Sequence, residues 1–232
     1  MKNLAAILCT GLGAILLAVG HYAGLFVAPP EAMMGDVGRI LYVHVPTAWL
    51  ALLTYFFAFI AACGALASGR DSWDATTEAC VEVGVLLTAM LLFQGSMWAK
   101  PTWGTYWTWD PRLTTTAIMG IAFTGVLVLR KLIHDHDRRR VVSSVATILA
   151  FVDVPIVYMS VKWWKSLHQT QSSPETVSDP MVWVLRTAAF GMLFLSIGFI
   201  LFRRRIALDR MQKEHGAAAL PQKKAPISLE TT

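Results

Sequence analysis

The chain of 232 residues is poor in charge, since only 15% of its residues are Asp, Glu, Lys or Arg, whereas soluble domains carry about 25%. Hydrophobic residues make up 55% of it, and the stretches 4–27 and 40–68 contain no formal charge. Because about 20 apolar residues suffice to cross a bilayer, this composition excludes a soluble globular enzyme, a disordered chain and a collagen-like chain. It predicts a polytopic membrane protein.

The chain also has only three cysteines, Cys9, Cys63 and Cys80, and no C-x-x-C pair. This excludes a disulfide framework, a zinc ribbon and the covalent haem attachment of a c-type cytochrome. No P-loop motif occurs, so the chain does not bind nucleotide phosphates in that way. The net charge of +5 comes from basic residues that flank apolar segments, where membrane orientation explains them better than nucleic acid does.

Six apolar segments are long enough to cross a membrane as helices. The first, residues 4–27, is longer than the roughly 7–15 apolar residues of a cleavable signal peptide, so we expect it to be retained. Period-two alternation is absent, which argues against a β-barrel. The sequence therefore predicts an all-α bundle of six transmembrane helices. The other five segments are residues 39–68, 75–99, 113–130, 141–163 and 181–202.

The distribution of Lys and Arg predicts how these helices face. With both termini in the cytoplasm, 14 of the 20 basic residues lie on the cytoplasmic side and six on the other, as the positive-inside rule requires. The loop between the third and fourth helices then lies on the non-cytoplasmic face. The chain divides into a transmembrane domain, residues 1–203, and a cytoplasmic tail, residues 204–232, which we expect to be disordered.

The loop between the third and fourth helices is rich in aromatic residues. An interfacial aromatic belt would account for this composition. However, Pro101, Gly104 and Pro111 are expected to break any continuous helix, so the rings belong to a folded loop. A surface of large flat rings suits a large, flat, apolar ligand. The aromatic residues of this segment are Trp98, Trp103, Tyr106, Trp107 and Trp109.

Two polar residues end this loop. Asp110 followed by Pro111 is a strong signal for the start of a helix, with the Asp as N-cap and the Pro as first helical residue. Arg112 lies in the first turn, where the helix dipole disfavours a cation. An anionic ligand group would account for its presence there.

Two histidines share the predicted face with this loop. His44 lies close to Pro46, which we expect to kink the second helix. An ionisable residue inside a span suggests function by default, although a hydrogen-bonded interfacial histidine is the structural alternative. His168, between the fifth and sixth helices, becomes a candidate because it shares this side with His44, and His21 also approaches it. Two neutral imidazoles could ligate a metal from opposite sides.

These residues together suit a flat, apolar, iron-bearing dianion. The histidines supply axial ligands and the tryptophans supply a platform. Arg112, with Lys100, Lys162 or Lys165, supplies cations for carboxylates. Haem is a molecule with these properties.

The segment from Trp103 to Thr114 reads WGTYWTWDPRLT. It resembles the tryptophan-rich signature W-G-x-x-W-x-W-D-x-R-L-T of haem-handling membrane proteins. Within that group, six spans in a short chain with one flanking histidine pair are similar to the CcmC family of bacterial cytochrome c maturation. The resemblance covers nearly the whole chain.

This resemblance implies that haem b is bound at the periplasmic face of the bacterial inner membrane, with His44 and His168 as axial ligands of the iron. It implies delivery of the haem to a periplasmic haem chaperone. An ABC transporter with separate ATPase and membrane subunits, and a small single-span accessory protein, would act in the same complex. No catalytic residue is implied. The haem-binding residues would be His44, His168, Trp98, Trp103, Trp107, Trp109, Asp110 and Arg112.

Two other classes of protein remain as alternatives. A membrane b-type cytochrome would hold haem as a fixed electron carrier, but such proteins place their ligands deep in the bundle, whereas His44 and His168 lie at its rim. A small-solute permease would have internal repeats and polar, broken helices near the midplane. The sequence shows neither beyond Pro46 and residues 153–155.

Three acidic residues inside the spans have no role in this interpretation. Glu78 and Glu82 lie one helical turn apart, where like charges repel mildly, so we expect a partner group or a water-filled cavity. Asp153 lies in mid-span beside Pro155, where a charge is costly unless it is paired or protonated. We expect it to contact a polar residue such as Gln94, or a partner subunit.

Overall fold

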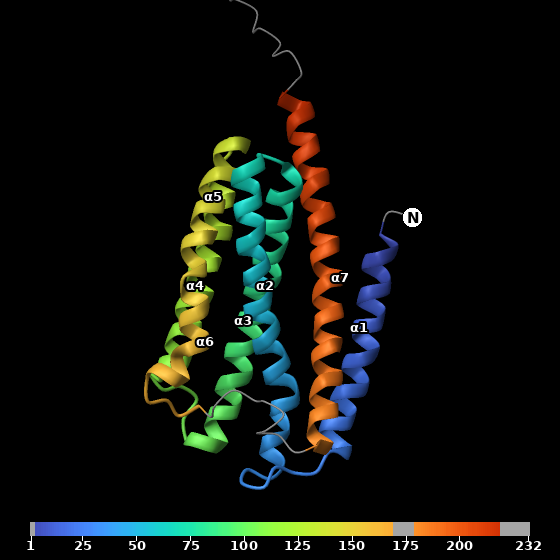
Figure 1. The fold of residues 1–232 in the computed structure, drawn as a ribbon, viewed down its shortest axis with the longest axis vertical. Coiled ribbons are helices and arrows are strands. Elements are labelled where there is room, and N and C mark those ends of the chain that lie inside the picture. Colours follow the sequence, from blue (N-terminus) through green and yellow to red (C-terminus); the bar gives the residue numbers. More distant parts are fainter. Residues whose placement is uncertain (1–2, 169–178, 219–232) are drawn as a thin grey trace, which may run out of the picture.

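A computed structural model describes residues 3–168 and 179–218. In this part of the chain the secondary structure is helical, and the helices lie side by side in an elongated bundle (Figure 1). Six segments of these residues are helical and long and apolar enough to cross a membrane, which confirms the predicted number of long apolar helices. The α-helices are α1 (Leu4–Tyr22), α2 (Leu41–Ser68), α3 (Asp71–Trp103), α4 (Pro111–Leu132), α5 (His136–Phe151), α6 (Asp153–Trp163) and α7 (Asp179–Ala218).

The fifth span consists of two helices, because α5 and α6 are separated by a turn at Val152. Pro155 explains the break, since it has no N–H to bond the carbonyl of Phe151 and its ring crowds that carbonyl. Asp153 therefore lies in the first turn of α6, where the helix dipole favours a carboxylate. The expected contact with Gln94 is not found: Asp153 Oδ2 and Gln94 Oε1 are both buried without a partner among the described residues.

The core of the bundle lies where α2, α3 and α4 meet. The ring of Tyr55 stacks on that of Phe123 with centroids 3.7 Å apart, and its hydroxyl is 3.0 Å from Thr88 Oγ1. A Cβ at Gly84 would lie 2.5 Å from the Tyr55 ring. A glycine is therefore needed at this position, because α3 passes directly against the aromatic ring.

Helix α1 lies at the side of the bundle and packs chiefly against α7 (Figure 1). The two backbones approach closely at small residues. A Cβ at Gly13 would lie 2.4 Å from Leu195 N, and one at Gly191 would lie 2.6 Å from Leu17 N. Small residues at such crossings let transmembrane helices gain van der Waals contact without a hydrophobic driving force.

The antiparallel course of the helices determines which segments share an end of the bundle. The last turn of α3, the first turns of α2 and α4 and the last turn of α6 lie at one end (Figure 1). We call this the Trp-loop end, because it carries the α3–α4 loop, residues 104–110. The last turn of α7 lies at the other end, which we call the opposite end.

An ionic network, buried at Arg130, Asp74 and Glu78, occupies the opposite end. Arg130 of α4 donates to both carboxylate oxygens of Asp74 at 2.7 and 3.0 Å, and to Glu78 at 2.7 Å. Arg210 of α7 donates to both oxygens of Glu78 at 2.9 and 2.6 Å. Arg203 likewise binds Glu82 through two contacts of 2.6 Å. The partners expected for the two glutamates are thus arginines of this chain, from α4 and α7.

Helix α7 continues past the predicted end of the last span. Disorder was expected from residue 204, yet the helix runs to Ala218. Its extension is held by contacts: Arg204 Nε donates to Thr76 Oγ1 at 2.9 Å, and Met211 is fully buried with Ala75 of α3. The rest of the predicted tail, residues 219–232, lies outside the described residues, and the division into domains stays a prediction.

The close approach of α1 and α7 predicts a position-specific effect of one methyl group. Gly13→Ala should lower the free energy of unfolding by about 1–3 kcal/mol, because its Cβ would overlap backbone atoms of α7. Gly11→Ala is the matched control, since a Cβ there meets nothing within 4 Å. Unfolding in mixed detergent micelles, followed by circular dichroism, measures both. Equal effects of the two substitutions would contradict this packing.

The ionic network predicts a second effect on stability. Asp74→Asn should cost about 3 kcal/mol, because Asp74 is fully buried and its loss leaves the buried Arg130 charge poorly compensated. Asp137→Asn is the control, because Asp137 is 78% exposed in its ion pair with Arg140, and exposed pairs contribute about 0–1 kcal/mol. The same unfolding assay separates them. A cost below that of the control would show that the network does not stabilise the bundle.

Candidate functional site

Helix α3 extends further into the aromatic segment than the prolines predicted. It contains Pro101 and continues to Trp103, where Gly104 ends it with φ +78° and donates its N–H to Lys100 O at 3.0 Å. One internal proline removes one hydrogen bond but does not end a helix that is packed along its length. Trp98 and Trp103 therefore lie on the last turns of α3, and Tyr106, Trp107 and Trp109 belong to the folded loop.

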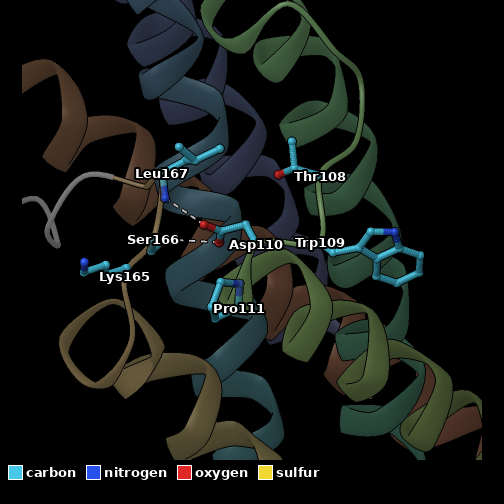
Figure 2. Close-up of a pocket in the computed structure, with 7 residues that line it drawn as sticks. All are labelled: Thr108, Trp109, Asp110, Pro111, Lys165, Ser166 and Leu167. Carbon is cyan, nitrogen blue, oxygen red and sulfur yellow. Dashed lines mark hydrogen bonds between the residues drawn. The ribbon is translucent and has the colours of Figure 1, made fainter.

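Asp110 is the N-cap of α4, as predicted, and its Oδ1 accepts the N–H of Arg112 at 2.9 Å. It also binds the segment that follows α6. Ser166 Oγ donates to Oδ1 at 3.1 Å, and the N–H of Leu167 donates to Oδ2 at 2.7 Å (Figure 2). His168 Nδ1 lies 3.1 Å from Oδ1. One buried carboxylate thus starts α4 and holds the loop that carries His168.

Asp110 and His168 influence each other's pKa. Burial would raise the pKa of Asp110, but the hydrogen bonds from Leu167, Ser166 and Arg112 outweigh it and hold the pKa below its ordinary value of 3.8. Burial lowers the pKa of His168 below 6.5, against the raising effect of Asp110 and with the lowering effect of Arg112. At neutral pH the pair is therefore a carboxylate and a neutral imidazole. Its Nδ1–H then donates to Asp110, and Nε2 is left as the atom that can ligate a metal.

Each candidate histidine meets a tryptophan of α3 edge to face. The rings of His168 and Trp103 have centroids 5.0 Å apart, and those of His44 and Trp98 are 5.4 Å apart. His44 is electrostatically coupled to both His168 and Arg112, so these three side chains lie in one neighbourhood. The structure thus brings together residues of α2, α3, α4 and the segment after α6.

The surroundings of His44 differ from those of His168. His44 lies in the first turns of α2, and a Cβ at Gly95 would lie 3.3 Å from its Cε1. Its Nδ1 is buried without a hydrogen-bond partner among the described residues. So are Trp98 Nε1 and Thr114 Oγ1, which lie on the adjoining turns of α3 and α4. Buried polar atoms without partners are uncommon in proteins, and two of those found here belong to His44 and to Trp98, whose rings are in contact.

The remaining predicted aromatic residues lie toward the surface. Trp109 is 81% exposed and meets Trp107 edge to face. Figure 2 shows the Trp109 indole directed away from the Asp110 carboxylate. A shallow hollow of about 350 Å³ lies beside them. It is lined by Thr108, Trp109, Asp110, Pro111, Lys165, Ser166 and Leu167.

Not every predicted residue joins this cluster. No hydrogen bond, ion pair or ring contact of the described residues links His21 to it. Lys100 is engaged locally, since its Nζ donates to Gly104 O at 3.1 Å and lies 5.2 Å from the Tyr106 ring centre. Lys162 is exposed and does not line the hollow.

Ser166 and Leu167 fix the His168 segment on Asp110 and were not predicted as site residues. Nothing in the sequence marks them, because a backbone N–H and a serine hydroxyl carry no motif. Trp163 and Trp164, which precede His168 by five and four residues, are exposed at the end of α6.

The fold and the cluster define a multi-span helical membrane protein with a histidine–carboxylate pair and a tryptophan-rich surface at one end. Comparison with known proteins identifies the class further. The family described as CcmC, Heme exporter protein C, matches residues 1–219. The chain belongs to this family, whose members are assigned to haem export and cytochrome c biogenesis.

Individual relatives agree over most of their length. Heme exporter protein C of Bradyrhizobium diazoefficiens is 32% identical over 204 residues, which is 85% of this chain and 77% of the relative. Heme exporter protein C of Escherichia coli is 35% identical over 203 residues, 86% and 82% of the two chains. A putative cytochrome c biosynthesis ccmC-like mitochondrial protein of Marchantia polymorpha is 32% identical over 198 residues, 84% of each chain.

The charges around His168 predict opposite shifts of its pKa. Asp110→Asn removes the charge that raises this pKa and should lower it further, whereas Arg112→Gln should raise it. NMR titration of ¹⁵N-labelled histidine in the haem-free protein measures both. Lys165→Gln is the control, because Lys165 lines the hollow but does not act on His168. Shifts of the same sign in Asp110→Asn and Arg112→Gln would contradict the geometry.

The lowered pKa of His168 also predicts how its contribution to the free energy of unfolding depends on pH. The folded-state pKa lies below the unfolded value of about 6.5, so the unfolded chain binds this proton more readily. The contribution of His168 to the free energy of unfolding is full above pH 6.5 and is lost as the pH falls through the folded-state pKa.

Proposed function

We propose that this protein binds haem b at the periplasmic face of the bacterial inner membrane and delivers it to a periplasmic haem chaperone during c-type cytochrome biogenesis. The observation that carries the proposal is the Asp110–His168 pair (3.1 Å), held beside His44 and the tryptophan-rich segment. Family membership supports haem as the cargo.

The residues of the Trp-loop end fit haem. Haem supplies an iron that two neutral imidazoles can ligate. His168 is oriented by Asp110, as metal-bound histidines are commonly oriented by a carboxylate at the other ring nitrogen. His44 Nδ1 and Trp98 Nε1 are buried without partners among the described residues, so polar groups of this site are left for a bound molecule. We propose His44 and His168 as the two axial ligands.

The other predicted residues take roles around this pair. Trp98 and Trp103 contact the two imidazoles and would fix their ring planes. Trp107 and the exposed Trp109 would cover a porphyrin face, since flat apolar rings stack well. Arg112 would pair with a haem propionate, because a guanidinium binds carboxylates well. Its electrostatic coupling to both histidines places it near the proposed ligands of the iron. Asp110 would act as a positioning residue for His168 rather than as a ligand.

The exposed position of the site favours a relay over a fixed electron carrier. Trp109 is 81% exposed and the adjoining hollow is shallow, so a partner protein could reach haem held there. A b-type cytochrome would instead enclose its haem between the helices. We assign the chain no catalytic residue and propose that it works with an ABC transporter's ATPase and membrane subunits and a single-span accessory protein.

The charge distribution supports the orientation. The opposite end carries many arginines, including Arg130, residues 138–140 and residues 203–205. Basic residues are retained on the cytoplasmic side of membranes. We therefore propose that the Trp-loop end faces the periplasm and that both termini lie in the cytoplasm.

The axial assignment predicts a loss of haem from two single variants. His44→Ala and His168→Ala should each remove or weaken the six-coordinate absorption spectrum of the detergent-purified protein, because each removes one ligand of the iron. Asp110→Asn should lower haem affinity about 10–100-fold, as expected for the loss of a group that orients a ligand. His21→Ala is the matched control, since His21 is a histidine at the same end of the bundle, in the last turn of α1.

Two results would overturn the assignment. Haem retained unchanged in both His44→Ala and His168→Ala would show that other groups ligate the iron. Haem lost from His21→Ala as from His44→Ala would show that the effect is not specific. In a deletion strain that carries each variant, loss of c-type but not b-type cytochromes distinguishes a relay in c-type biogenesis from an electron carrier or a permease.

A further inference from the structure

A second group of potential metal ligands lies at the opposite end of the bundle, away from the proposed haem site. It consists of Asp71, His136 and His215, whose ligand atoms all lie within 4.8 Å of one another. Asp71 is in the first turn of α3, His136 begins α5 and His215 is in the last turn of α7. The three residues come from positions up to 144 apart in the chain (215 − 71), so only the fold brings them together.

The distances suit a tetrahedral ion. His136 Nε2 lies 3.1 Å from Asp71 Oδ1, and His215 Nδ1 lies 3.4 Å from Asp71 Oδ2. Zn²⁺ binds histidine nitrogen and carboxylate oxygen at about 2.0–2.2 Å, so neighbouring ligand atoms of a tetrahedral ion lie about 3.3–3.6 Å apart, and either oxygen of Asp71 could be the ligand. The two imidazoles have ring centres 4.4 Å apart, which allows both to approach one ion.

The surroundings also suit a cation. His136 is flanked in the sequence by Asp135 and Asp137. Two arginines of the same helix have carboxylate partners of their own: Arg139 is paired with Glu214 and Arg140 with Asp137. His136 Nδ1 is buried without a partner among the described residues. Metal-bound histidines commonly donate the other ring N–H to a carboxylate, a carbonyl or a water molecule, and a water molecule would take this position at Nδ1.

We propose that Asp71, His136 and His215 bind one divalent transition-metal ion of the Zn²⁺ class. Two imidazoles and one carboxylate match the ligands of Zn²⁺ and similar ions, whereas Mg²⁺ and Ca²⁺ prefer oxygen ligands alone. The His215 side chain is 54% exposed and that of Asp71 is 28% exposed, so an ion can enter and a water molecule can complete the coordination. The ion would join α3, α5 and α7 and hold the end of α7 on the bundle.

Metal binding by single-histidine variants tests the site. The full-length protein, purified without a polyhistidine tag, is titrated with Zn²⁺ against a chromophoric chelator and with Co²⁺, whose visible absorption reports tetrahedral coordination. His136→Ala and His215→Ala should each weaken Zn²⁺ binding by about 100-fold or more, since loss of an outer-sphere group already costs 10–100-fold. Zn²⁺ should also raise the thermal unfolding midpoint of the unmodified protein but not of His215→Ala.

Two controls exclude other binding sites. His134→Ala removes an exposed histidine two residues from His136 and should leave Zn²⁺ affinity unchanged. The double variant His44→Ala/His168→Ala should also retain it, because it removes the histidines at the other end of the bundle. His215→Ala changes a half-exposed residue, so circular dichroism and gel filtration should show a folded protein. Zn²⁺ affinity that survives in His136→Ala and His215→Ala, or is lost in His134→Ala or the double variant, would overturn the proposal.

Discussion

The candidate site depends on one buried carboxylate. Asp110 caps α4 and also holds the segment after α6 through Ser166, Leu167 and His168. A carboxylate has enough acceptor positions for all of these donors, and its own burial makes the ionised form dependent on them. The position of His168 relative to α4 is therefore fixed by hydrogen bonds to a single side chain rather than by a regular element.

The two ends of the bundle differ from its apolar middle, and from each other, in the contacts that hold the helices together. Close backbone approach joins α1 to α7, as at Gly13, and the middle is held by the Tyr55 ring, which stacks on Phe123 and packs against Gly84. The opposite end uses buried arginine–carboxylate pairs such as Arg130–Asp74, which join α3 and α4. The Trp-loop end instead combines the Asp110–His168 pair with exposed aromatic rings such as that of Trp109. Such an arrangement stabilises the chain less, but it leaves groups that can bind a ligand.

Features with a local physical cause were predicted from the sequence. The six spans follow from length and hydropathy, and the cap at Asp110 follows from the Asp-Pro pair. Features that depend on competition with packing were not. Pro101 did not end α3, because the helix is long and supported by its neighbours, whereas Pro155 did divide the fifth span. The helical extension of α7 to Ala218 depends on buried Met211 and on arginine contacts with α3, which composition does not reveal.

The sequence by itself determined the number of membrane spans, the tryptophan-rich segment and the two candidate histidines, because hydropathy, aromatic content and residue type are properties of the chain alone. Only the tertiary structure decided which groups meet. It paired His168 with Asp110 across 58 positions of the chain, gave Glu78 and Glu82 their arginines, and assembled Asp71, His136 and His215. Such contacts arise when helices distant in the chain pack side by side, and no local pattern of residues shows which distant helices become neighbours.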